Sequence, residues 1–176
     1  MNQQHYELST QIGAILKRNA WQLSTAESCT GGWLARCITD IPGSSAWFET
    51  GFVTYSNAAK HRQLGAPLEL FDGPAAPGAV SAQTVKAMAE GALNRANAHV
   101  AVATSGIAGP DGGSADKPVG TVWFGWAWQG AGQALASQTK RCVFEGDRES
   151  VRSQSVTTAL QGLLALLQEQ DKIGTL

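Results

Sequence analysis

Hydrophobic positions along the chain follow two spacings, one with the period of a helix and one with the period of a strand. Leu8, Ile12 and Leu16 recur at helical spacing, so the first segment is predicted to be a helix that ends near residues 18–19. The same spacing predicts helices at 33–38, 81–93 and 151–167. Alternating, β-branched and aromatic runs predict strands at 21–26, 47–55, 99–103, 120–128 and 134–144.

Capping and turn residues mark where these elements begin and end. Ser81 and Asp147 are expected N-caps, and Asn57 is the expected N-cap of a short helix that holds Lys60. Clustered prolines and glycines predict an irregular loop at 65–80, and residues 129–132 join two strands as a hairpin. The order of elements predicts an α/β fold, a three-layer α/β/α sandwich whose hairpin makes the sheet mixed, with residues 1–176 as a single domain.

Composition narrows the class of function. The formal net charge is -1 and no long run of Lys or Arg occurs, so we expect no nucleic-acid partner. No stretch approaches the roughly 20 apolar residues that span a bilayer, and the N-terminus lacks an apolar signal core. We therefore expect a cytoplasmic protein with no membrane partner. Three scattered cysteines (Cys29, Cys37 and Cys142) form no ligand cluster with histidines, so neither a disulfide framework nor a metal site is expected.

Two polar, glycine-rich loops, at 27–32 and 104–113, follow predicted strands. In layered α/β domains ligands bind beyond the carboxyl ends of the strands, where helix N-termini present free N–H groups. The hydroxyls and close-approach glycines of these loops suit a phosphate, although each loop alone is also typical of an ordinary strand-to-helix turn. The residues expected to bind substrate in them are Ser28, Thr30, Gly31, Gly32, Thr104, Ser105, Gly106 and Gly109.

A serine nucleophile needs a base, and no histidine lies in either loop or in residues 43–60. Lys60 is the candidate base, because burial or a nearby cation lowers the pKa of a lysine toward neutrality. The alternative for Lys60 is a solvated lysine on a surface helix, and Ser45 has the alternative role of a helix cap. Cys29 is a second candidate nucleophile, because a helix N-terminus lowers the pKa of a thiol.

Four motifs occur in order: TAESCTGG, GSSAWFETGFVTYSNAAK, TSGIAGPDGG and KPVGTVWFGWA. They resemble the CinA C-terminal domain family, and closely its stand-alone PncC type of nicotinamide-nucleotide amidase. The resemblance runs from about Trp21 to Arg152. It implies hydrolysis of nicotinamide mononucleotide to nicotinic acid mononucleotide and ammonia, with no metal or organic cofactor.

The resemblance also implies roles for particular residues. Ser45 becomes the nucleophile and Lys60 its base, with Tyr55 and Ser28 as supporting polar groups. The glycine-rich loops and one arginine, Arg141 or Arg148, are expected to bind the substrate phosphate, because guanidinium pairs bidentately with phosphate oxygens.

The expected partner is a small-molecule pyridine nucleotide, and the chain is expected to form a homo-oligomer. An alternative function is a non-catalytic nucleotide-binding regulatory module linked to competence or DNA damage. Such a module keeps the glycine-rich loops without needing a serine and Lys60 together.

Overall fold

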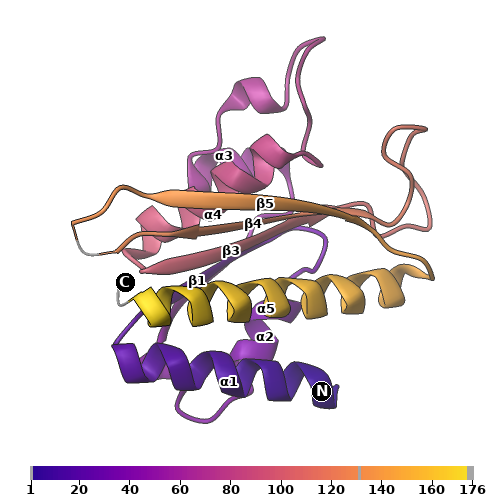
Figure 1. The fold of residues 1–176 in the computed structure, drawn as a ribbon. Coiled ribbons are helices and arrows are strands. Elements are labelled where there is room, and N and C mark those ends of the chain that lie inside the picture. Colours follow the sequence, from indigo (N-terminus) through magenta and orange to yellow (C-terminus); the bar gives the residue numbers. More distant parts are fainter. Residues whose placement is uncertain (1, 131, 174–176) are drawn as a thin grey trace.

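Five strands form one mixed sheet in the order β2-β1-β3-β4-β5 (Figure 1). The computed structural model describes residues 2–130 and 132–173. β1 (Leu23–Glu27) pairs in parallel with β2 (Phe48–Val53) on one side and β3 (Val100–Gly106) on the other. β4 (Thr121–Trp128) and β5 (Ala136–Val143) continue the sheet in antiparallel fashion as the predicted hairpin.

Helices cover both faces of the sheet, which confirms the predicted α/β/α sandwich. α3 (Asn57–Leu64) and α4 (Ala82–Ala96) lie on one face, and α2 (Trp33–Thr39) and α5 (Arg148–Ile173) lie on the other (Figure 1). α1 (Gln3–Asn19) runs along α5, so it covers that helix and α2 rather than the sheet (Figure 1). Two single-turn 3-10 helices, η1 (Ser44–Ala46) and η2 (Leu68–Leu70), complete the elements.

Most of the predicted element boundaries are confirmed, and two are wrong. The Ser81 side chain accepts from the amide of Thr84, and the Asp147 carboxylate accepts from the amide of Ser150, as caps should. The cap of α3 is Ser56 rather than Asn57, because the Ser56 hydroxyl accepts from the Ala59 amide. β3 extends to Gly106, so the first three residues of the second glycine-rich loop belong to the strand.

The core lies on both sides of the sheet. The larger hydrophobic cluster lies between the sheet and α1, α2 and α5, and a smaller one lies under α4. α5 approaches β4 closely at Gly162, where an added Cβ would stand 2.2 Å from the ring of Trp126. The Trp126 indole N–H donates to the carbonyl of Ala159, so this large side chain fixes α5 on the sheet. No helix among the described residues is long and apolar enough to cross a membrane.

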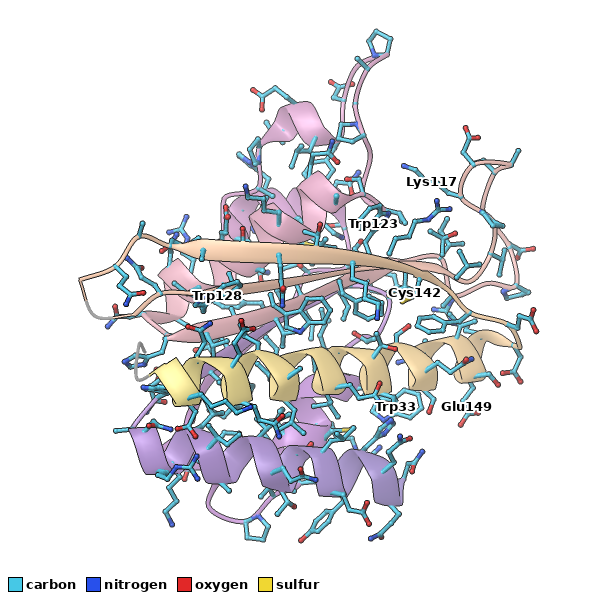
Figure 2. All side chains as sticks on the ribbon, in the orientation of Figure 1. Trp33, Lys117, Trp123, Trp128, Cys142 and Glu149 are labelled. Atoms are coloured by element: carbon cyan, nitrogen blue, oxygen red, sulfur yellow. The ribbon has the colours of Figure 1, made fainter. Side chains whose placement is uncertain are left out.

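The strand directions bring three chain segments to one edge of the sheet. β1, β2 and β3 are parallel, so the residues that follow them, near Ser28, Thr54 and Ile107, meet at the same edge. The amino end of α5 reaches this edge as well, with Trp33 and Glu149 close to each other there (Figure 2). In parallel sheets this edge is where ligands bind.

Candidate active site

A buried lysine and a buried serine meet at this edge. Lys60 Nζ lies 2.9 Å from Ser28 Oγ, and the two side chains come from α3 and from the loop after β1. Lys60 is 1% exposed and Ser28 is 8% exposed. Lys60 Nζ also lies 2.9 Å from the carbonyl oxygen of Thr54 and 3.4 Å from that of Tyr55.

Burial changes the acid–base chemistry of this lysine. Removal from water lowers the pKa of Lys60 from 10.5 to about 8, because burial disfavours the charged ammonium. Among the described residues no carboxylate forms an ion pair with Lys60. A neutral amine has two N–H groups and one lone pair. With its N–H groups on the carbonyls of Thr54 and Tyr55, its lone pair faces the Ser28 hydroxyl and can accept that proton.

The structure does not bring Ser45 to Lys60. Ser45 is exposed in η1, directly before the amino end of β2, where Gln22 donates to the carbonyl of Ala46. Lys60 follows the carboxyl end of the same strand. A six-residue strand separates its two ends by roughly 17 Å. The structure therefore does not place Ser45 beside Lys60, because a whole strand carries the chain across the sheet between the two residues.

The first glycine-rich loop does not offer its helix N-terminus to a ligand. The buried Glu27 carboxylate accepts from the amides of Gly32, Leu34 and Ala35 at 3.0, 3.0 and 2.7 Å. Gly31 and Gly32 have φ of +61° and +91°, so glycine is needed there to reverse the chain before α2. These three amides are therefore not available to a phosphate, since a carboxylate of this chain already occupies them.

The two predicted loops are joined to each other. The Thr30 and Thr104 hydroxyls lie 2.8 Å apart in the buried interior, and the Ser28 amide donates to the Thr104 carbonyl at 3.0 Å. The hydroxyls of Thr30 and Thr104 thus serve the packing of the loops. Within residues 2–130 and 132–173, the amides of Cys29 and Thr30 donate to no other residue, although the Cys29 amide contacts its own thiol. These two residues follow Ser28 directly in the chain.

A cavity of about 200 Å³, here called the active-site cavity, opens beside Ser28 and Lys60. Arg148 donates from Nη1 to the carbonyl of Gly109 and from Nη2 to the Tyr55 hydroxyl at 3.0 Å. The Ser105 hydroxyl donates to the carbonyl of Ala79, which fixes part of the 65–80 loop as a wall. The lining residues are Ser28, Cys29, Tyr55, Lys60, Ala79, Val80, Ser105, Gly106, Ala108 and Arg148.

The sequence profile of the CinA C-terminal domain matches residues 5–167. The chain belongs to the CinA C-terminal domain family. It is 56% identical over 162 residues to the nicotinamide-nucleotide amidohydrolase PncC of Enterobacter agglomerans, covering 90% of this chain and 93% of that protein. It is 55% identical over 157 residues to the PncC of Escherichia coli K12, covering 89% and 91%.

Solved structures of the CinA family share this fold. A competence damage-inducible protein A from Klebsiella pneumoniae has a TM-score of 0.85 and 40% sequence identity, covering 93% of this chain and 97% of that one. A competence/damage inducible protein from Agrobacterium tumefaciens has a TM-score of 0.83 and 41% identity, covering 94% and 97%.

Cys29 is a poor candidate for the nucleophile of this CinA-family chain. Burial, assisted by the charge of Glu27, raises the pKa of the Cys29 thiol to about 12. The thiol therefore stays protonated near neutral pH, and a protonated thiol is a weak nucleophile. The helix N-terminus that was expected to lower this pKa is neutralised by the Glu27 carboxylate.

The two arginines expected at the phosphate have different positions. Arg141 lies on β5 and donates to the carbonyl of Asp116, away from the active-site cavity, whereas Arg148 lines it. The sequence analysis missed Arg152, which donates to the carbonyls of Cys29 and Thr30 at 3.1 and 2.8 Å. The sequence did contain a signal for Arg152. It lies four residues after the candidate Arg148, and residues four apart on a helix share a face.

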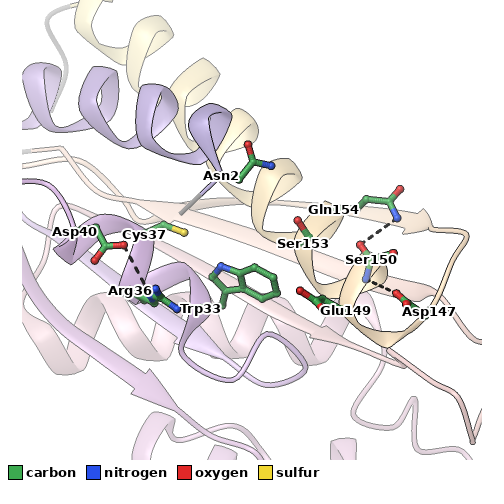
Figure 3. A pocket seen from close by; sticks show the side chains of 10 residues that line it. All are labelled: Asn2, Trp33, Arg36, Cys37, Asp40, Asp147, Glu149, Ser150, Ser153 and Gln154. Atoms are coloured by element: carbon green, nitrogen blue, oxygen red, sulfur yellow. Dashed lines mark hydrogen bonds and ion pairs between the residues drawn. The ribbon is translucent and has the colours of Figure 1, made fainter.

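A larger cavity, about 680 Å³, lies between the amino end of α1, α2 and the first turns of α5 (Figure 3). Its polar side chains largely pair with one another: Arg36 with Asp40, and Gln154 with the carbonyl of Ser150. Its Ser150 hydroxyl lies beside the exposed Asp147 carboxylate rather than beside a buried amine, so the smaller cavity at Ser28 is the candidate active site. Among the described residues no group of three or more His, Cys, Asp and Glu side chains is placed to hold a metal ion.

Proposed function

We propose that this chain hydrolyses the carboxamide of nicotinamide mononucleotide to give nicotinic acid mononucleotide and ammonia. The observation that carries the proposal is the buried contact of 2.9 Å between Lys60 Nζ and Ser28 Oγ at the wall of a cavity. The PncC relatives, at 55–56% identity over about nine-tenths of the chain, supply the substrate in their names. The proposal needs neither a nucleic-acid partner nor a metal ion.

The first step is attack by Ser28. Neutral Lys60 takes the proton from Ser28 Oγ as that oxygen bonds to the carboxamide carbon, which gives a tetrahedral intermediate with one oxyanion. The amides of Cys29 and Thr30 are the donors that we assign to this oxyanion, because they follow Ser28 directly in the chain and donate to no other residue among those described. One such donor lowers the barrier by about 3 kcal/mol in acyl-transfer sites.

The second step releases ammonia. The C–N bond breaks, the carbonyl re-forms as an ester on Ser28, and the leaving nitrogen takes one proton. Lys60 holds the proton that it received from Ser28 and is the direct donor. The Tyr55 hydroxyl accepts from Arg148, which leaves its own proton free to hydrogen-bond the substrate amide.

The third step frees the enzyme. Water gives a proton to Lys60 and attacks the ester carbon, and the serine oxygen leaves with that proton as nicotinic acid mononucleotide departs. Lys60 thus acts as base, then acid, in each half of the reaction. Ser45 has no part in these steps.

Ammonia release from nicotinamide mononucleotide by the purified protein, measured with excess chelator, tests this proposal. The wild type is expected to turn over the nucleotide. Ser28→Ala should lose at least about 1,000-fold in kcat, because nucleophile and base act as one unit. Ser45→Ala is the matched control, an exposed serine at the opposite edge of the sheet, and should keep turnover within about twofold of wild type.

Two results contradict the proposal. Absence of ammonia release by folded wild type at high enzyme concentration favours the non-catalytic regulatory module. Full activity of Ser28→Ala beside an inactive Ser45→Ala variant returns the nucleophile to Ser45.

A further inference from the structure

Ala79 and Val80 form part of the wall of the active-site cavity, and these two residues are here called the cavity wall. They end the 65–80 loop, directly before Ser81, the N-cap of α4. A further cavity, of about 410 Å³, lies on another side of this segment, and Val80 lines both cavities. With a cavity on two sides, the cavity wall is only partly supported by packing, so its position depends on hydrogen bonds of the backbone.

Side chains from three parts of the chain make these hydrogen bonds. Lys117 Nζ donates to the carbonyl of Pro77 at 2.7 Å. The Ser105 hydroxyl of β3 donates to the carbonyl of Ala79 at 2.7 Å. Between these two, the carbonyl of Gly78 accepts from two hydroxyls at the start of α4, each at 2.8 Å. Three successive carbonyls thus have side-chain donors, and the bond from Lys117 is the charge-assisted one, which is the stronger kind.

The backbone of Lys117 is itself held in place. Lys117 begins the KPVGTVWFGWA motif, in the loop between β3 and β4. Its carbonyl accepts from the Ser114 amide at 2.9 Å, and its amide donates to the Ser114 carbonyl at 3.2 Å. Arg141 of β5 donates to the carbonyl of Asp116 at 2.8 Å, which ties this turn to the sheet. The Lys117 side chain is half-buried, and no carboxylate among the described residues forms an ion pair with it. Lys117 therefore connects the sheet to the 65–80 loop.

We propose that Lys117 is a positioning residue for the amidase reaction, because its bond to the Pro77 carbonyl holds the cavity wall in place beside the reacting groups. This inference rests on the proposed function, which puts the carboxamide in the active-site cavity. That cavity has a volume of about 200 Å³, so the position of one wall determines how much space the amide has beside Ser28. A displaced wall admits a bulkier amide, and it lets the primary carboxamide leave the geometry that attack requires.

Lys117→Met removes the donor and keeps an unbranched side chain, and two measurements on it test the inference. Hydrogen–deuterium exchange examines the loop without turnover, and the amides of residues 71–80 should exchange at least about fivefold faster than in the wild type. Kinetics compares nicotinamide mononucleotide with its analogue that has one methyl group on the amide nitrogen. The preference in kcat/KM for the unmethylated amide should fall at least about fivefold. The dependence of kcat/KM on the pKa of Lys60 should not change.

Two further variants serve as controls. Lys117→Arg keeps a cationic donor, so the exchange rates and the amide preference should both stay within about twofold of the wild type. Lys140→Met makes the same change of charge at an exposed lysine of β5 that lines neither cavity, and it should alter neither measurement.

Four results overturn the inference. The first is a Lys117→Met variant with the exchange rates and the amide preference of the wild type. The second is a Lys117→Arg variant that behaves like Lys117→Met, because the donor then has no role. The third is an equal loss of kcat/KM for both amides, which indicates general destabilisation, and the fourth is an equal effect of Lys140→Met, which indicates net charge alone. Failure of the proposed function is a different result, namely no ammonia release by wild type, and the exchange measurement does not depend on it.

Discussion

At the scale of single residues, the proposed mechanism depends on the groups that surround the Lys60 amine. Lys60 is almost fully buried, makes two backbone hydrogen bonds through carbonyls and has the Ser28 hydroxyl as its remaining neighbour. Its pKa of about 8 leaves a useful fraction of neutral base near physiological pH. An exposed lysine with its ordinary pKa near 10.4 would be protonated almost completely.

The lowered pKa predicts the pH dependence of the reaction. Lys60 must be neutral to take the Ser28 proton, so kcat/KM should fall about tenfold per pH unit below pH 8 and level off above it. Lys60→Arg should be inactive at every pH, because a guanidinium stays protonated. Lys86→Arg, an exposed lysine on α4, is the control and should keep the wild-type profile. A profile without a limb near pH 8 would show that Lys60 is not the base.

At the scale of elements, the loop between β1 and α2 is held from three directions. Glu27 binds the first amides of α2, Thr30 is tied to Thr104 of β3, and Arg152 of α5 binds the carbonyls of Cys29 and Thr30. The loop therefore places Ser28 through contacts with three separate elements. Sequence composition suggests a phosphate-binding loop here, whereas the contacts indicate a well-held loop that positions the nucleophile that we propose.

Replacement of Glu27 tests this role. In Glu27→Gln an amide nitrogen that cannot accept replaces one carboxylate oxygen, so at least one buried N–H loses its partner. We expect a loss of about 1–3 kcal/mol in the free energy of unfolding, measured by urea denaturation, together with a lower kcat. Asp40→Asn, at the opposite end of α2, is the control and should change stability by less than about 0.5 kcal/mol. Unchanged stability and kcat in Glu27→Gln would contradict the role of this loop.

At the scale of the whole molecule, the parallel direction of β1, β2 and β3 assembles the site. Periodicity and capping residues together were sufficient to predict the α-helices and strands among residues 2–130 and 132–173, and so the α/β/α sandwich. The two glycine-rich loops were also correctly placed at the carboxyl ends of two strands, β1 and β3, which the structure shows to be parallel neighbours. Motif order and turn composition do not encode which groups face one another, so the sequence did not reveal that the Glu27 carboxylate occupies the amides of Gly32, Leu34 and Ala35.

Ser28, and not the expected Ser45, lies beside Lys60 for a physical reason. Ser45 is nearer to Lys60 in sequence, but β2 separates them, whereas Ser28 follows β1 at the same edge as Lys60. If β1 and β2 are taken as parallel neighbours, the predicted strands already place Ser28 and Lys60 at the same edge of the sheet. Arg152 reaches the site from 122 residues beyond Thr30, a contact that only the fold creates.

Identification of the residue that becomes acylated tests the central claim most directly. Wild-type protein is mixed with nicotinamide mononucleotide, quenched in acid before the first turnover is complete, digested with trypsin and examined by mass spectrometry. Cleavage after Arg18, Arg36 and Lys60 separates the peptide 19–36, with Ser28 and Cys29, from 37–60, with Ser45. The account predicts the nicotinate mononucleotide ester in peptide 19–36, assigned by fragmentation to Ser28. An adduct in peptide 37–60, or on Cys29, would contradict it.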